Sequence, residues 1–373
     1  MRQDIYSQIQ RISGKRPVVF LLPGLMGSRL VCDGREIWPS PLSLVASGAT
    51  NLAIDCCGIL PSSLVNGPYS ALSARLRQTA DVIEFAYDWR RSLADEARHL
   101  DQAVRLVSSR LEGSGQPVRF LGHSMGGMLA RVMITRHRDT WVRLCNAQPG
   151  VLLTMLGTPN GGSMSIVRTL LGLGPVIRTL RTCLGSSAAA STLALLSQLP
   201  GFLELLPSGW GTDYLQQHSW EPLEAVTPAG WAPPPAQALQ AARKLRQDMV
   251  LRKEDAGRIV MISGQAAATP IGLRATRSGL QILTTIAGDG RVPWQTSHLA
   301  GVARWYAPGV AHGALPRNRM VQQAVVDLFT SGQTETLPQI APGASHNLIV
   351  QAWSKAIAGL SMSDRTSWNL HTI

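Results

Sequence analysis

The sequence lacks the features of secreted disulfide scaffolds, zinc proteins and membrane-spanning proteins. Its 373 residues include only five cysteines, an odd number, and none of them has the C-x-x-C or Cys/His spacing of a metal site. No uninterrupted apolar run approaches the ~18 residues that a membrane-spanning helix needs. Residues 1–16 are polar and contain no apolar signal-peptide core. We therefore expect a cytoplasmic protein with reduced thiols.

Cofactor motifs are absent as well. The chain contains no H-E-x-x-H pair and no Walker loop, so we expect neither a metal nor a nucleotide cofactor. Charged residues make up only 16% of the chain, yet the formal net charge is +12, which favours anionic partners. No nucleic-acid motif accompanies the scattered arginines, so we expect no nucleic-acid partner. Peripheral contact with an anionic membrane is one interpretation, and a soluble surface with spare positive charge is the other; the oligomeric state is left open.

The sequence does contain a short apolar run, residues 118–121, followed by a glycine–serine–glycine turn and an amphipathic stretch over residues 128–137. This G-x-S-x-G pattern, with Ser124 between Gly122 and Gly126, is typical of a nucleophile elbow when it joins a strand to a helix. The turn is so sharp that we expect a strained serine backbone, and a Cβ at either glycine would collide with the neighbouring strand or helix. A glycine-rich connection without chemistry is the alternative.

Several apolar runs rich in β-branched residues predict a central sheet. These runs cover residues 17–22, 81–86, 151–156, 258–263 and 303–307. Each is typical of a buried strand, and helical patterns lie between them. We therefore expect an α/β fold, with a mostly parallel central sheet and helices on both faces.

Changes of pattern along the chain predict its domain organisation. A first part of the core is expected over 1–162, a helical cap insertion over 163–255, a second part of the core over 256–332, and a tail or linker over 333–373. Within the first part, residues from about 31 to 75 are rich in loop-forming residues. We interpret them as a lid or lipid-contacting flap that holds Trp38, and a buried structural tryptophan is the alternative.

Two residues far from the elbow supply what a serine nucleophile needs. A serine hydroxyl requires a base within hydrogen-bond reach, and the base requires an acid that orients it. Asp289 lies in a Gly-Asp-Gly turn, and His312 lies in the loop beyond the last predicted strand. We expect both residues to lie in loops that follow strands of the central sheet, where the carboxyl ends of the strands converge. His298 follows Asp289 too closely for another strand to intervene, and His123 is expected to point away from the hydroxyl. We therefore predict a catalytic triad of Ser124, Asp289 and His312.

The sequence resembles the lecithin:cholesterol acyltransferase family of α/β-hydrolases, in a bacterial-type version. The matching residues are 17–28 (PVVFLLPGLMGS), 87–90 (YDWR), 122–127 (GHSMGG), 157–163 (GTPNGGS), 288–294 (GDGRVPW) and His312. Ser-Asp-His is also the chain order of the triad in the α/β-hydrolase fold. The resemblance implies that Ser124, Asp289 and His312 form the family triad and that the backbone N–H groups of Leu25 and Met125 form the oxyanion hole. It also implies a cap and a mobile lid. Secreted members carry a signal peptide and a disulfide-held lid, and neither is evident here.

The predicted function is a serine hydrolase or acyltransferase that acts on lipid esters, of phospholipase A or lipase type, through an acyl-enzyme intermediate. The acyl group passes to water or to an alcohol. An esterase or peptidase for soluble substrates on the same fold is an alternative. A hydrolase-like module that binds a lipid or a protein without turnover is the third interpretation.

Overall fold

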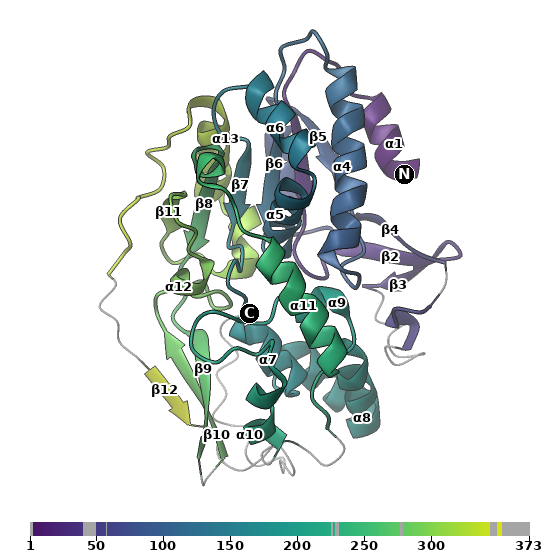
Figure 1. The fold of residues 1–373 in the computed structure, drawn as a ribbon, viewed down its shortest axis with the longest axis vertical. Helices are drawn as coiled ribbons and strands as arrows, with labels where there is room; N and C mark the ends of the chain where they lie inside the picture. Colours follow the sequence, from purple (N-terminus) through teal and green to yellow (C-terminus); the bar gives the residue numbers. More distant parts are fainter. Residues whose placement is uncertain are drawn as a thin grey trace.

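A six-stranded parallel sheet forms the centre of the molecule (Figure 1). The computed structural model describes residues 3–39, 50–56, 58–224, 227, 231–276, 279–343 and 349–352. The strands are β1 (Val18–Leu22), β5 (Asp81–Glu84), β6 (Val118–His123), β7 (Leu153–Leu156), β8 (Ile259–Gly264) and β11 (Ala303–Ala307). Their spatial order is β11-β8-β7-β6-β1-β5, and every neighbouring pair is parallel. All five strands predicted from apolar runs, together with the strand that leads into the elbow, are present.

Both faces of this sheet are buried, which explains why its strands are continuously apolar. In β1, Phe20 and Leu22 belong to one hydrophobic cluster, whereas Val19 and Leu21 belong to the other. The first cluster is shared with α1 (Gln3–Gln10), α4 (Leu93–Arg110), α5 (Met125–Arg136) and α6 (Arg138–Ala147). The second is shared with α3 (Ser70–Leu76) and α13 (Arg319–Ser331). The predicted fold, a parallel sheet between two helical layers, is therefore confirmed.

The segment expected to be a lid loop contains regular structure. A small antiparallel sheet is formed by β2 (Ser28–Cys32), β3 (Arg35–Trp38) and β4 (Ile59–Leu64), with a 3-10 turn, η1 (Thr50–Leu52), between the last two. This sheet projects from the side of the core (Figure 1). Residues 40–49 of the expected lid lie outside the described residues. Within the described residues, Gly34 and Gly58 lie in turns next to these short strands.

A run of helices separates β7 from β8 along the chain. It comprises α7 (Met164–Leu170), α8 (Pro175–Leu196), α9 (Pro200–Leu203), η2 (Gln217–Ser219), α10 (Glu221–Glu224), α11 (Ala236–Asp248) and η3 (Lys253–Arg258). All of these except η3, which directly precedes the start of β8, lie at the end of the molecule toward which the strands of the central sheet run (Figure 1). None of the helices in the described ranges combines the length and the apolar character that a membrane crossing requires. The proposed domain limits remain a prediction.

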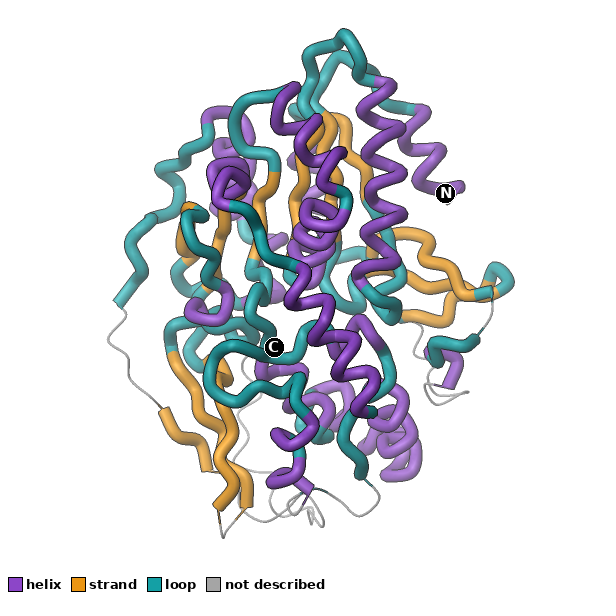
Figure 2. The backbone as a smooth tube through the Cα atoms, viewed as in Figure 1, coloured by secondary structure: helices purple, strands orange, loops and turns teal. Residues whose placement is uncertain are grey.

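The strand before Asp289 does not belong to the central sheet. Residues 269–285 form the hairpin β9 (Thr269–Thr276) and β10 (Gly279–Thr285), and β12 (Ile349–Ala352) pairs with β10. Figure 2 shows this group of strands apart from the central ones. The expectation that the acid follows a strand of the central sheet is therefore wrong. α12 (Trp294–Ser297) and η4 (His312–Arg317) complete the elements of the core.

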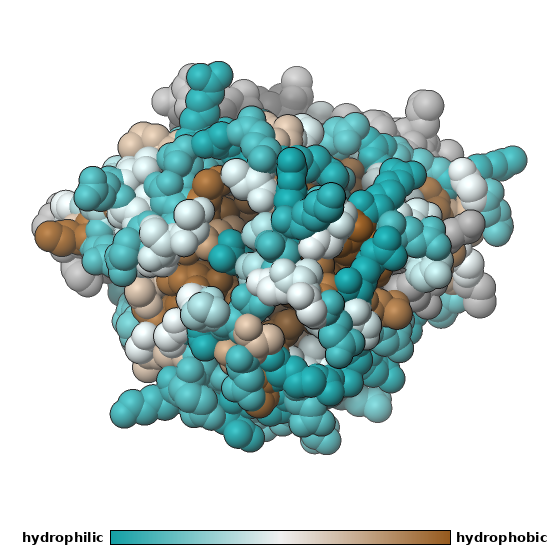
Figure 3. Space-filling view, turned by 90° about the horizontal axis from the view of Figure 1, so that it is seen from above, coloured by the Kyte–Doolittle hydropathy of each residue, from teal (hydrophilic) through white to brown (hydrophobic). Residues whose placement is uncertain are grey.

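The face of the molecule that carries the α4–β6 connection is largely hydrophilic, and apolar side chains show there mainly in recesses between polar ones (Figure 3). This face lies at the end where the strands of the central sheet begin. The carboxyl ends of the strands, where ligands bind in open α/β sheets, point to the other end of the molecule.

Candidate active site

Ser124 occupies a sharp turn between β6 and α5. Its backbone has φ 54° and ψ −121°, a conformation that residues with a side chain rarely adopt. A Cβ on Gly122 would lie 2.5 Å from the Cα of Gly127, and a Cβ on Gly126 would overlap the carbonyl oxygen of Leu22. The expected strain and the expected need for both glycines are therefore confirmed. The turn holds the serine at the start of α5, where helix N–H groups have no acceptor within the helix.

The side chains of Ser124, His312 and Asp289 form one hydrogen-bonded chain. The Oγ of Ser124 lies 2.9 Å from Nε2 of His312, and Nδ1 of His312 lies 2.8 Å from Oδ2 of Asp289. The other carboxylate oxygen, Oδ1, accepts the backbone N–H groups of Arg291 at 3.0 Å and Val292 at 2.8 Å. All three side chains are buried, and Ser124 is only 9% exposed. The structure thus brings the three predicted residues together in the predicted order.

Asp289 reaches the histidine although its strand lies outside the central sheet. The backbone N–H of His312 donates to the carbonyl oxygen of Asp289 at 2.8 Å, which ties the two loops together. Gly157, at the end of β7, has φ 56°, and a Cβ there would lie 2.8 Å from Oδ2 of Asp289. A Cβ on Gly264, at the end of β8, would lie 3.0 Å from the Cβ of Asp289. Glycines at the ends of two central strands therefore leave room for the acid.

The turn after β1 lies beside the nucleophile, as the oxyanion prediction requires. A Cβ on Gly24 would be 3.1 Å from the Cβ of Ser124, so the backbone of this turn reaches the serine. Leu25 follows Gly24 in the turn, and Met125 is the first residue of α5. The role of their N–H groups in holding an oxyanion remains a prediction.

Two tyrosines hold the backbone of this turn. The hydroxyl of Tyr87 donates to the carbonyl oxygen of Pro23 at 2.8 Å, and the hydroxyl of Tyr69 accepts the N–H of Gly24 at 2.7 Å. Burial raises the pKa of both phenols, so both remain neutral donors. Tyr87 belongs to the YDWR match, but no sequence pattern indicates a role for Tyr69, which lies in the segment interpreted as a lid.

Trp38 holds the same turn from the other side. Its indole N–H donates to the carbonyl oxygen of Met26 at 2.9 Å, and its ring packs edge-on against Trp89 with 5.5 Å between ring centroids. Met26 has φ 62°, so this hydrogen bond restrains a strained residue. The contacts of Trp38 are therefore those of the structural alternative. A role in a lid is not needed to explain them.

His123 connects the turn to His312. Its Nε2 lies 3.2 Å from the carbonyl oxygen of His312, and its Nδ1 lies 2.8 Å from the hydroxyl of Tyr69. A carbonyl oxygen only accepts, so Nε2 of His123 carries the proton, and Tyr69 donates to Nδ1. Burial, followed by the charge of His312, lowers the pKa of His123 well below its usual value, which keeps the ring neutral. The side chain of His123 therefore contacts the backbone of the loop that contains His312.

The remaining candidates lie away from these contacts. His298, the rejected alternative base, is exposed and borders a separate cavity next to α11. Within the described ranges, no group of three histidine, cysteine or acidic side chains is placed to hold a metal ion.

The central sheet, the serine elbow after β6 and the inserted helices define an α/β-hydrolase fold. Residues 73–224 match the family model "Lecithin:cholesterol acyltransferase", so the resemblance to that family is confirmed over this segment. It includes the elbow and most of the inserted helices. Together, the fold and this match support an ester hydrolase.

Solved structures of low sequence identity are similar to parts of the chain. The mature lipase BlEst2 of Bacillus licheniformis has 12% identity and a TM-score of 0.39, and the match covers 85% of this chain and 91% of the lipase. The phospholipase PlaB of Legionella pneumophila has 15% identity and a TM-score of 0.31, with 66% and 39% covered. The metagenomic carboxyl esterase MGS0156 has 13% identity and a TM-score of 0.38, with 82% and 67% covered. No curated protein sequence matches the chain.

Proposed function

We propose that the protein is a serine hydrolase or acyltransferase that cleaves lipid esters through an acyl-enzyme intermediate. The observation that carries this proposal is the hydrogen-bonded chain from Asp289 through His312 to Ser124 at a strained elbow. A serine in this setting has a base within reach, and the base has an acid that fixes its tautomer. A serine with only a structural role would need neither the strained turn nor the hydrogen-bonded pair of His312 and Asp289.

The proposed reaction has two halves. The Oγ of Ser124 attacks the acyl carbonyl carbon while Nε2 of His312 takes the hydroxyl proton. The ester C–O bond then breaks, and His312 returns the proton to the leaving alcohol. In the second half, water or another alcohol loses its proton to His312 and attacks the acyl-enzyme. Ser124 leaves with that proton, and the product is a free acid or a new ester.

Two backbone donors would stabilise the charged intermediates of both halves. The N–H groups of Leu25 and Met125 would donate to the oxyanion, and one such donor contributes ~3 kcal/mol of barrier reduction. The turn that holds Leu25 is restrained by hydrogen bonds with three aromatic side chains: Tyr87 and Trp38 donate to it, and Tyr69 accepts from it. A donor held in place before the reaction needs no reorganisation during it.

The side chains next to the nucleophile support an apolar acyl group. Met125 is fully buried, and a Cβ on Gly201 of α9 would lie 2.9 Å from its methyl carbon. Phe202, also in α9, packs edge-on against Trp89 with 6.5 Å between ring centroids. The match to the acyltransferase family and the net charge of +12 further support an ester carried by an anionic membrane, which the protein would contact peripherally.

The first test is labelling by a fluorophosphonate, which reacts with activated serines. We expect labelling of the unchanged protein and none of Ser124→Ala. Equal labelling of the two proteins, or no labelling of either, would remove the enzymatic proposal. Melting temperatures of both proteins serve as the control for folding.

The second test concerns the substrate. Hydrolysis of mixed phospholipid vesicles is compared with that of a short-chain soluble ester, with and without an added alcohol, and products are identified. Release of fatty acid, or formation of a new ester with the alcohol, is the expected result. Cleavage of the soluble ester alone would instead support the esterase interpretation.

A further inference from the structure

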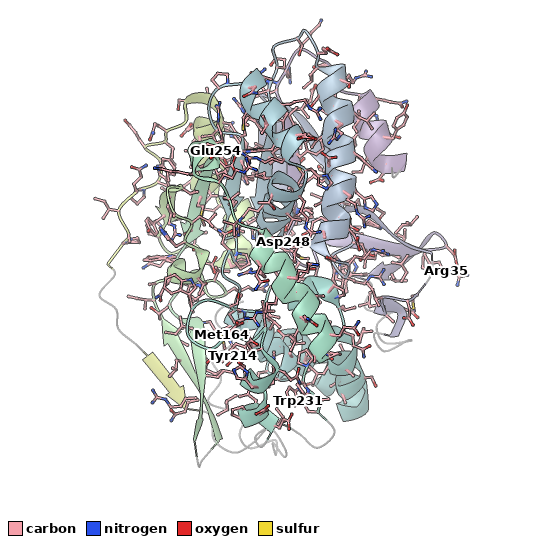
Figure 4. All side chains as sticks on the ribbon, viewed as in Figure 1. Arg35, Met164, Tyr214, Trp231, Asp248 and Glu254 are labelled. Carbon is pink, nitrogen blue, oxygen red and sulfur yellow. The ribbon has the colours of Figure 1, made fainter. Side chains whose placement is uncertain are left out.

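A polar cavity of about 380 Å³ lies between α5, α11 and the loop that contains residues 208–215. α11 packs on both α5 and α9, so the cavity borders the inserted helices as well as the core. In Figure 4, Asp248 marks the end of α11 that lies over α5, and Tyr214 marks the loop on the other side. The cavity is lined by side chains from all three elements, and arginines dominate its charge. We call it the arginine cavity.

Arg131, in α5, forms the inner wall of the arginine cavity. Its side chain is only 6% exposed. Two of its nitrogens are hydrogen-bonded, to the amide oxygen of Asn160 at 3.0 Å and to the carbonyl oxygen of Met249 at 2.6 Å. Its Nε has no hydrogen-bond partner. The Nε atom is itself buried, so the inner wall of the cavity contains a guanidinium with one unsatisfied donor, and burying a charge is costly unless it is paired.

The positive charge of the cavity exceeds its negative charge. Arg131, Arg243 and Arg246 line it against a single carboxylate, Asp213, which leaves a formal charge of +2. Within the described part of the chain, no carboxylate lies within ion-pair distance of these three arginines. Burial, followed by the charge of Arg246, lowers the pKa of Arg131 to about 9. An anion in the cavity would raise this pKa, because it stabilises the charged form of the guanidinium.

The arginine cavity is separate from the proposed nucleophile. Arg131 follows Ser124 by seven residues on the same helix, and seven residues of α-helix span about 10 Å. None of the triad residues lines the cavity. Its mouth carries the indole of Trp210, which is 44% exposed, and the imidazole of His298. The cavity therefore offers an aromatic face beside its charged wall.

We infer that the arginine cavity binds a phosphate monoester. Guanidinium groups match the geometry of phosphate, and several can share one phosphate group. A phosphate monoester carries a charge close to −2 at pH 7, which balances the excess of +2, whereas a carboxylate or a phosphodiester carries only −1. The cavity is also large enough for an organic group next to the phosphate, because ligand sites begin at about 300 Å³. That group would contact Trp210.

The first experiment is isothermal titration calorimetry with glycerol 3-phosphate. Saturable binding is expected, and Arg243→Gln should weaken it about tenfold, because a charge-assisted hydrogen bond is lost. Arg243 is exposed on α11, so its replacement leaves the fold intact. Lys244→Gln is the matched control: it removes the same charge from the next residue of the same helix, which does not line the cavity. Equal weakening by both variants, or no binding by the unchanged protein, would overturn the inference.

A second set of titrations separates the sources of the phosphate and the role of the triad. Vesicles that contain phosphatidic acid, a monoester, are compared with vesicles that contain phosphatidylglycerol, a diester. If the protein prefers phosphatidic acid and Arg243→Gln abolishes this preference, the cavity binds a lipid head group. If the protein binds glycerol 3-phosphate alone, the cavity binds a soluble ester. Either result supports a monoester site. The inference is contradicted if three results occur together: both vesicles bind equally, Arg243→Gln does not change that binding, and glycerol 3-phosphate does not bind. Ser124→Ala should bind as the unchanged protein does, because binding does not depend on the proposed reaction.

Discussion

The triad and the arginine cavity are two polar sites that α5 helps to form, and they differ in how the charges of their buried groups are satisfied. At the triad, the carboxylate of Asp289 accepts two backbone N–H groups and one imidazole N–H, so its charge is held by the protein itself. In the arginine cavity, Arg131 keeps an unbonded Nε and has no carboxylate partner among the described residues. The first site is complete without a ligand. The second has an excess of charge that an external anion would balance.

The largest effect is expected from a substitution that inactivates the triad and leaves the arginine cavity unchanged. Replacement of Ser124 by alanine removes the proposed nucleophile, so ester hydrolysis should fall by ~10⁴-fold or more. The readout is the initial rate on the substrate that the vesicle assays identify. The calorimetric titration with glycerol 3-phosphate is the internal control, and it should give the same affinity as before. A residual rate within tenfold of the unchanged protein would mean that the reaction takes place elsewhere.

A pair of matched substitutions compares the two carboxylates directly. Asp289→Asn should lower kcat by ~10⁴-fold, since an amide cannot stabilise the imidazolium and favours the wrong tautomer of His312. Asp213→Asn, in the arginine cavity, makes the same chemical change and should leave kcat unaltered. Its carboxylate accepts the N–H of Leu215 at 3.0 Å, a bond that an asparagine oxygen can keep. Similar kcat values for the two variants would argue against the role given to Asp289.

Glu204 sharpens the comparison because it is a buried carboxyl group whose pKa is set mainly by burial, and the charge of Arg136 opposes that effect only in part. Its carboxylate accepts the hydroxyl of Ser92 at 2.6 Å and the N–H of Leu93 at 2.8 Å, which joins α9 to the start of α4. Burial raises its pKa from 4.5 to about 7, against the opposing effect of these hydrogen bonds. Between these two pH values the folded protein holds a proton that the unfolded chain has lost. The free energy of unfolding should therefore fall as pH rises through this window, by up to ~3 kcal/mol.

Denaturant unfolding at pH 5 and pH 8 measures this effect. In Glu204→Gln the corresponding part of the pH dependence should disappear, because the amide does not titrate. Glu221→Gln, which changes an exposed carboxylate of α10, is the control and should keep it. An unchanged pH slope in Glu204→Gln would show that the group titrates normally.

The smallest expected effect concerns the support of the triad. Tyr69→Phe removes one hydroxyl that bonds both the N–H of Gly24 and Nδ1 of His123. The turn that presents Leu25 and the loop of His312 are then less well positioned, so we expect kcat to fall about tenfold with little change in KM. Tyr6→Phe, on the exposed side of α1, is the control. A fall in melting temperature without a change in kcat would assign Tyr69 a purely structural role.

The sequence predicted those parts of the molecule whose pattern is local. A strand buried on both faces must be apolar throughout, so β1 and β8 were recognisable from their residues alone. The elbow was equally recognisable, because the two glycines around Ser124 are required by contacts within the turn and with the nearest strand. The position of Asp289 was predicted, but its strand was assigned to the wrong sheet. β10 has the composition of any half-buried strand, and composition does not say which partner it pairs with.

Other features depend on contacts between distant segments, which leave no pattern in the sequence. Tyr69 lies in a stretch rich in loop-forming residues, and its hydroxyl acts only because β1 and β6 bring Gly24 and His123 beside it. The indole N–H of Trp38 donates to the carbonyl oxygen of Met26, in the turn before β2, and no sequence pattern indicates this contact. The bond from Nε2 of His123 to the carbonyl oxygen of His312 is likewise not indicated by the sequence, because His312 lies far along the chain.

The sequence by itself therefore determined the parallel sheet, the strained serine turn and the identity of the three residues that meet there, because each depends on nearest-neighbour sterics or on chain order. Only the tertiary structure decided which groups hold the turn of Leu25, and only it collected three arginines from two helices around one cavity. The physical reason is that burial and charge balance are properties of a place in space. An arginine in α5 has the same sequence signature whether its charge is paired or not, and its environment is set by α11, more than one hundred residues later.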